Sequence, residues 1–154
     1  MATSSHSWSE TDFDNLSWHD NHIHGLAVRG GEHGVGDLVL DIDFILEWLC
    51  DSRSGSCQFR IAPATLTFHQ VSDLVIALSY AAPRAAIGPA SIGEIARVPH
   101  VFPNGYSSFR WTVAVNWPSG SIDFVASGFT QTLRASPALV AEQYLSAERR
   151  QALV

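Results

Sequence analysis

FRWTVAVNWPSGSIDFVA, residues 109–126, is the stretch that decides the fold class. Over residues 109–117, apolar side chains stand at every second position with mostly polar ones between them, which is the pattern of a β-strand with one buried face. Residues 118–120, Pro-Ser-Gly, favour a turn, and the apolar alternation resumes over residues 122–126. We therefore predict a β-hairpin here. The register that puts both apolar sets on one face pairs Trp117 with Ile122, Val115 with Phe124, and Val113 with Ala126.

Similar alternation, often interrupted by Gly, Pro, Asn or Ser, runs along most of the chain. Further strands are predicted at residues 22–29, 37–47, 57–61, 64–69, 73–80, 91–98 and 128–134. Residues 81–91 are rich in Ala, Pro and Gly and are expected to be a surface connection. Residues 1–12 are expected to be a flexible N-terminus, and residues 136–154 a C-terminal helix or tail that Pro137 could begin.

These elements predict the fold class. Neither an internal repeat nor a linker interrupts the pattern, so one domain is expected over residues 1–154. Strands at this spacing predict an all-β, antiparallel sandwich or flattened barrel of about eight strands, with a short C-terminal helix or tail.

The composition of the chain disfavours some classes of binding partner. The 154 residues carry a formal charge of −6 and a pI near 5.5, and the basic residues are scattered, which disfavours nucleic acid and anionic membranes as partners. The sequence starts without a secretion signal and contains no apolar stretch of membrane-spanning length, so we expect a soluble, cytoplasmic protein.

Cys50 and Cys57 flank a turn-like hexapeptide and could face each other across a hairpin. Reduced thiols are nonetheless the expectation for a cytoplasmic protein, in preference to a disulfide.

The stretch SWHDNHIHG, residues 17–25, is the most promising source of chemistry. His22 and His24 stand two residues apart on a predicted strand and therefore share one face. In the next predicted strand, residues 37–47, one face is strongly apolar. The other face carries more carboxylates than a core accepts, and these belong to Asp37, Asp41, Asp43 and Glu47.

The Gly-rich segment at residues 30–36 favours a hairpin between these two strands. Burial selects the register that keeps the apolar residues together. The apolar pairs in that register are Ile23 with Ile42, Gly25 with Leu40, and Ala27 with Leu38. The same register places His22 opposite Asp43 and His24 opposite Asp41, so we expect these four side chains to converge.

Three interpretations of this cluster stay open. The commonest arrangement of such residues is a solvated face on which histidines and carboxylates pair across strands. The second is a site for a divalent metal such as zinc, iron or manganese, since two imidazoles and one or two carboxylates suit these ions. The third is metal-free acid–base catalysis by a His–Asp pair, which requires a pocket. The candidate metal ligands are His22, His24, Asp41 and Asp43, with His19 and Asp20 as further candidates, although the His19–Asp20 step is better suited to capping a turn.

Four motifs carry a resemblance to a known family. They are LSWHDNHIHGL at residues 16–26, GDLVLDIDFILEWL at 36–49, APATLTFHQVSDL at 62–74 and NWPSGSIDFVASGFTQTLR at 116–134. Together they resemble a widespread bacterial family of small single-domain proteins without an assigned activity, and the resemblance spans about residues 13–148. It implies similarity at Trp18 and allows an aromatic residue such as Tyr in place of His24. The resemblance therefore gives added weight to His19, Asp20, Asp41 and Asp43.

Two classes of function follow. The favoured one is a binding or interaction module of the immunity or accessory type, because the acidic charge suits a basic protein partner and no complete catalytic constellation is visible. A small ligand, or a second copy of the chain joined through an edge strand, is another expected partner. The alternative is a small metal-assisted enzyme. Convergence of the His/Asp cluster at a cavity would favour the enzyme, and dispersal over a flat acidic face would favour the interaction module.

Overall fold

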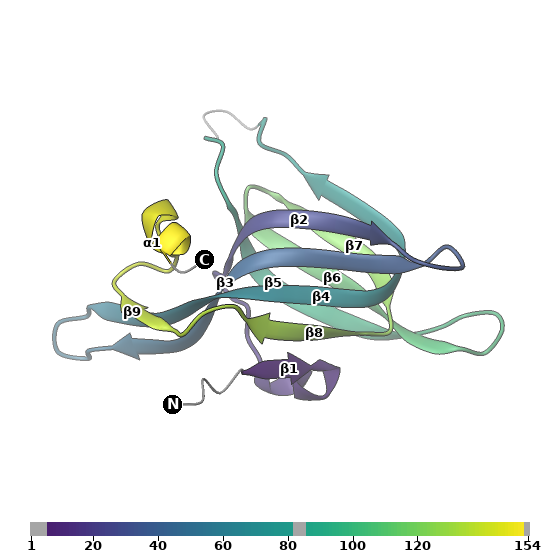
Figure 1. Cartoon of the computed structure of the whole chain (residues 1–154), viewed down its shortest axis with the longest axis horizontal. Coiled ribbons are helices and arrows are strands. Elements are labelled where there is room, and N and C mark those ends of the chain that lie inside the picture. Colours follow the sequence, from purple (N-terminus) through teal and green to yellow (C-terminus); the bar gives the residue numbers. More distant parts are fainter. Residues whose placement is uncertain (1–5, 82–85, 153–154) are drawn as a thin grey trace.

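The computed structural model describes residues 6–81 and 86–152, which form one extended antiparallel β-sheet that curls on itself (Figure 1). The strands are β1 (Ser7–Ser9), β2 (His22–Gly30), β3 (Gly36–Cys50), β4 (Cys57–Leu78), β5 (Ala90–Val101), β6 (Ser107–Trp117), β7 (Gly120–Ala126), β8 (Gly128–Leu133) and β9 (Ala138–Val140). A 3₁₀ helix, η1 (Glu10–Asn15), follows β1, and a short helix, α1 (Ala147–Ala152), lies near the C-terminal end. The predicted all-β class with a short C-terminal helix is confirmed.

The sheet closes into a flattened barrel. Successive antiparallel pairings run from β4 through β3, β2, β5, β6 and β7 and return to β4. The pairing of β2 with β5 is the shortest of these, since it joins only His22 and Ile23 to Ser91 and Ala90. Figure 1 shows β2, β3, β4 and β8 in one layer, with β5, β6 and β7 behind them.

β4 belongs to both layers. Its first part pairs with β3 on one edge and with β8 and β9 on the other, and its last part pairs with β7. The strand turns the corner near Gln70 and Asp73, which have positive φ angles of 54° and 52° beside a shift in register, as expected where a bulge bends a strand. The sequence predicts three strands here, at residues 57–61, 64–69 and 73–80, and the structure joins them into one.

Pro63 explains part of that difference. A proline normally interrupts a sheet because it cannot donate a backbone hydrogen bond. Here its carbonyl oxygen accepts from the backbone N–H of Arg134 at 2.8 Å, so its nitrogen faces the same edge, between the end of β8 and the start of β9. The missing donor therefore costs no bond in the β3–β4 ladder.

The hairpin over residues 109–126 forms, but in a different register. Val113 lies opposite Ile122, Trp111 opposite Phe124 and Phe109 opposite Ala126, so the register is displaced from the predicted one by four residues on one strand. The apolar sets still share a face because the displacement is even. In the observed register β7 begins at Gly120, opposite Val115, a position that requires glycine because an added Cβ would lie 2.0 Å from the Ala77 carbonyl oxygen.

That register has a consequence for Trp117. In the predicted hairpin Trp117 lies opposite Ile122, inside the β6–β7 ladder. In the structure it pairs with Ser91 of β5 instead, and its side chain stays 40% exposed.

The interior of the barrel is filled by large aromatic and aliphatic side chains. Phe68, Trp111, Phe124 and Phe129 are fully buried and meet one another in edge and tilted contacts. The predicted apolar face of β3 is part of this core, with Leu38, Leu40, Ile42 and Phe44 buried. A second, smaller core forms outside the barrel, where Leu145 packs on Ile45, Phe59 and Ile61.

Two expectations about the termini and cysteines are wrong. Residues 7–12 are not a flexible N-terminus, since β1 pairs with β8 and Trp8 packs on Phe44 at a ring separation of 5.1 Å. Cys50 and Cys57 form a disulfide rather than a pair of reduced thiols, because β3 and β4 continue beyond the core until these residues lie opposite each other. In the predicted connection at residues 81–91, positions 82–85 lie outside the described residues, and β5 begins at Ala90.

Candidate functional site

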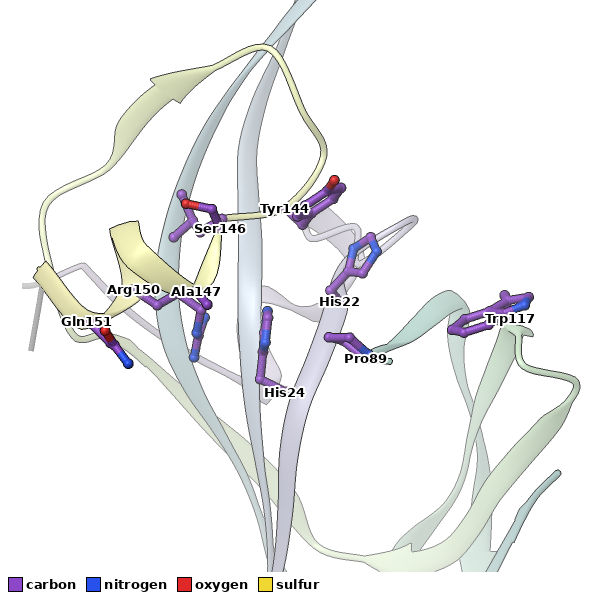
Figure 2. Close-up of a pocket in the computed structure, with 10 residues that line it drawn as sticks. His22, His24, Pro89, Trp117, Tyr144, Ser146, Ala147, Arg150 and Gln151 are labelled. Atoms are coloured by element: carbon purple, nitrogen blue, oxygen red, sulfur yellow. The ribbon is translucent and has the colours of Figure 1, made fainter. Parts of the chain in front are cut away.

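A cleft of about 570 Å³ lies between the start of β2 and the C-terminal segment, a volume within the range of small-molecule sites. Figure 2 shows His22 and His24 from β2 on its floor with Pro89 beside them, and Trp117 at one side. The opposite wall comes from residues 144–147 together with Arg150 and Gln151. Except for these polar groups the lining is largely apolar.

A β-bulge sets the directions of the two histidines. His22 lies opposite Asp43 and Ile23 opposite Ile42, as predicted, but the register then shifts and Gly25 lies opposite Asp41. The predicted pairing of His24 with Asp41, and of Gly25 and Ala27 with Leu40 and Leu38, is therefore wrong. Bulges re-aim side chains in this way, and His24 contacts Asp43 instead.

Asp43 is the centre of the polar network. It is fully buried, and its Oδ2 accepts from the backbone N–H of Leu145 at 2.9 Å and lies 2.7 Å from His24 Nε2. Its Oδ1 accepts from Arg150 Nη1. A buried carboxylate requires this degree of pairing, and two of the three donors come from the C-terminal segment.

Asp41 is neutralised by the same segment. Arg150 Nη2 donates to Asp41 Oδ1 at 2.6 Å, and Arg134 Nη2 donates to the same oxygen. Asp41 remains partly exposed, whereas the Arg150 side chain is only 14% exposed. Arg150 thus bridges the two aspartates on the outer face of β3.

The four residues predicted as metal ligands are therefore close together but unequally placed. His24 contacts Asp43, both carboxylates are paired with guanidinium groups, and His22 stands apart on the cleft floor. Within residues 6–81 and 86–152, no group of three or more His, Cys, Asp or Glu side chains has the arrangement of a metal site.

One ring nitrogen of His22 lacks a hydrogen-bond partner within the described part of the chain. Its Nδ1 is buried and has no hydrogen-bond partner among the described residues. Its ring lies 5.1 Å from the ring of Tyr144, tilted by 52°. Burial lowers the pKa of His22 below its ordinary value, and His24 adds to that effect, while Asp43 and the backbone of Asp20 oppose it.

His19 and Asp20 lie outside the cleft, in the turn before β2. Asp20 has a φ of 62°, and its carboxylate accepts from Asn116 and Gln143 side-chain amides, each at 3.0 Å. His19 Nδ1 lies 3.0 Å from the Gly93 carbonyl oxygen, and its ring stacks near Trp48 at 6.3 Å. These contacts fit the turn-capping interpretation, and Asp20 also fastens the C-terminal segment through Gln143.

Sequence reasoning missed three residues of the site, Trp117, Tyr144 and Arg150. A physical signal for Arg150 is present in the sequence, because two aspartates on a largely apolar strand require cationic partners if either is buried. No comparable signal marks Tyr144, which Leu145 places at the cleft by burying itself in the second core.

No family model, no curated protein and no solved structure matches this chain. The resemblance carried by the four sequence motifs therefore stays a prediction. None of the described helices is both long and apolar enough to cross a bilayer.

Proposed function

We propose that this protein is a binding module whose ligand is a small organic molecule held in the cleft between β2 and the C-terminal segment. The observation that carries the proposal is the cleft itself, which combines a volume of about 570 Å³ with an apolar lining and an unpartnered imidazole at His22. Few convergent polar groups in a mostly apolar pocket are characteristic of ligand sites.

The contacts on the cleft floor favour this form of binding module over one that masks a basic protein. A masking surface requires exposed carboxylates, whereas Asp43 is buried and Asp41 is paired with two arginines. The net charge of −6 supports attraction of a basic partner only through its long-range field. The cleft offers a defined place for a ligand.

A fragment screen tests the proposal. Ligand-observed NMR would be recorded with the parent chain, a Tyr144→Ala variant and a Trp48→Ala control, since Trp48 is a comparably exposed aromatic outside the cleft. We expect fragments that bind the parent and the Trp48→Ala variant but lose binding in the Tyr144→Ala variant. Fragment hits that survive Tyr144→Ala and Trp117→Ala alike would reject the cleft as the binding site.

Acid–base catalysis is a second candidate, supported by the 2.7 Å contact between His24 Nε2 and the buried Asp43 carboxylate. A carboxylate that orients an imidazole beside a pocket is a recurrent catalytic arrangement. Fragments that bind would be incubated with the parent and with His24→Gln, and their conversion followed by NMR. Conversion by the parent alone would support catalysis, and equal spectra would reject it for those compounds.

A metal-assisted enzyme has less support, because Arg134 and Arg150 already pair with the carboxylates that a metal would need. Metal content by mass spectrometry, with untagged parent and a His22→Ala, Asp43→Ala double variant, tests this alternative. Near-stoichiometric zinc, iron or manganese in the parent that disappears in the double variant would establish it.

The disulfide bears on where the protein acts. Disulfides persist in oxidising compartments and are uncommon in the cytosol, so the Cys50–Cys57 bond opposes the cytoplasmic location expected from the sequence. We propose an oxidising compartment. Alkylation of free thiols in intact cells before lysis tests this, since a cytoplasmic protein would be labelled on both cysteines.

A further inference from the structure

We infer that the cleft selects an uncharged, flat ring compound that donates one hydrogen bond to His22. This inference rests on the proposed binding function and names the chemical class of its ligand. Three features of the cleft support it, namely its charge balance, its exposed aromatic rings and the imidazole of His22.

The charge balance excludes a charged ligand. Among residues 6–81 and 86–152, Arg150 is the only Asp, Glu, Lys or Arg that lines the cleft, and its guanidinium is shared between Asp41 and Asp43. An anion would therefore have to compete with two carboxylates for the guanidinium, and a cation would find neither carboxylate free. Since an unpaired charge is costly to bury, a neutral ligand fits best.

The exposed aromatic rings that line the cleft favour a flat ligand. Trp117 and Tyr144 stand at different sides of the cleft (Figure 2) and are 40% and 45% exposed. Trp117 is held from behind by an edge contact with Tyr80 at 5.8 Å, and Tyr144 by its contact with His22. Rings that are already positioned, yet have free faces, offer stacking surfaces at little entropic cost.

His22 supplies the hydrogen bond. Because its Nδ1 is buried, Nε2 is the ring nitrogen that a ligand in the cleft can reach. Burial lowers the pKa of His22, so the imidazole is neutral near pH 7 and one of its two nitrogens is a hydrogen-bond acceptor. We assign the acceptor to Nε2, the nitrogen that faces the ligand, so the matching ligand group is an N–H or O–H donor.

Indole and three relatives test the inference by isothermal titration calorimetry. Indole is neutral and has one N–H, indole-3-acetate adds a negative charge, tryptamine adds a positive charge, and 1-methylindole lacks the donor. We expect indole to bind at least about tenfold more tightly than either charged relative, and about fivefold more tightly than 1-methylindole.

His22→Phe is the matched variant, since it keeps a flat ring but removes the acceptor. We expect it to weaken indole about fivefold and to leave 1-methylindole unchanged, with Trp48→Phe as a control that changes neither. A thermal melt establishes that His22→Phe is folded, and His22→Leu repeats the comparison if it is not.

The outcomes separate this inference from the proposed function. If a charged relative binds as tightly as indole, and Tyr144→Ala abolishes that binding, the ligand class is wrong and the binding function stands. Equal loss of indole and 1-methylindole in His22→Phe would overturn the hydrogen bond. If none of the four binds at about 1 mM, the inference fails, and the fragment screen decides whether the binding function fails with it.

Discussion

At the scale of single residues, Asp43 explains why the C-terminal segment is attached where it is. A carboxylate without any exposed surface needs several donors, and it receives them from Leu145, Arg150 and His24. The wall of the cleft is thus fixed by the requirement to neutralise one buried charge. The same requirement explains the position of α1, which contains Arg150.

Removal of Arg150 should therefore be costly. We expect Arg150→Met to lower the free energy of unfolding by about 3 kcal/mol, because it leaves the buried Asp43 carboxylate without its guanidinium partner. Arg149→Met, in the same helix but exposed, should change it by less than about 0.5 kcal/mol. Urea unfolding of both variants measures the difference, and equal losses would contradict the assigned role of Arg150.

His22 should make stability depend on pH. In the unfolded chain its pKa returns to about 6.5, whereas burial lowers it in the folded protein. Between these two values the unfolded chain binds more protons, so the folded state loses stability as the pH falls below 6.5. Urea unfolding between about pH 7.5 and 5.5 should show a shallower loss in His22→Asn than in the parent. Identical slopes would contradict the lowered pKa and would mean that Asp43 and Asp20, which raise the pKa of His22, fully offset its burial and the effect of His24.

The candidate site shows what the sequence can and cannot predict about residues. The alternation of polar and apolar positions correctly brings His22 opposite Asp43, because burial of Ile23 and Ile42 fixes that register. It cannot place the bulge at His24, which depends on a local backbone choice. Nor can it place Arg150, whose approach to Asp43 depends on the path of the whole C-terminal segment.

At the scale of elements, the β3–β4 hairpin extends well beyond the barrel. Its outer part carries Trp48, Phe59 and the disulfide, and it forms the base on which Leu145 packs. The predicted strand at residues 37–47 stops short of this part because the alternation weakens after Glu47. The extension is held by the second core and by the disulfide instead of by the barrel interior.

Reduction of the disulfide should weaken the molecule measurably. The bond closes a short loop, with a sequence separation of 7, for which the loss of unfolded-chain entropy is worth about 2.5 kcal/mol. We expect a Cys50→Ser, Cys57→Ser double variant to lose about that much free energy of unfolding. Parent protein in dithiothreitol should match the double variant in oxidised buffer, and a reduced parent as stable as the oxidised one would contradict the prediction.

At the scale of the whole molecule, the fold class was accessible from sequence because one face of most strands is buried. The period-two pattern of residues 109–117 and the apolar face of β3 both survive in the structure. Closure of the barrel was harder to predict from the sequence. It depends on the bend of β4 at Gln70 and Asp73, where the sequence indicates an interruption rather than a continuous strand.

Because β4 belongs to both layers, the molecule should unfold as one unit. β4 pairs with β3, β8 and β9 in one layer and with β7 in the other, so both layers lose pairings if β4 leaves, and we expect a single cooperative transition. Far-UV circular dichroism reports the sheet, and tryptophan fluorescence reports Trp18 and Trp111 in the core. The two midpoints in urea should coincide, and two separated transitions would show that the layers are independent.

The pairing of β1 with β8 has a further consequence for the order in which the protein is made. Ser7 lies opposite Thr132, so β1 finds its partner strand only after all the residues between them have been synthesised. Pairings between distant parts of a chain form slowly, and until β8 has been made Trp8 lacks its backbone partner Gln131. Until β8 has been made, a nascent chain therefore leaves β1 unpaired and its Trp8 ring available to a chaperone.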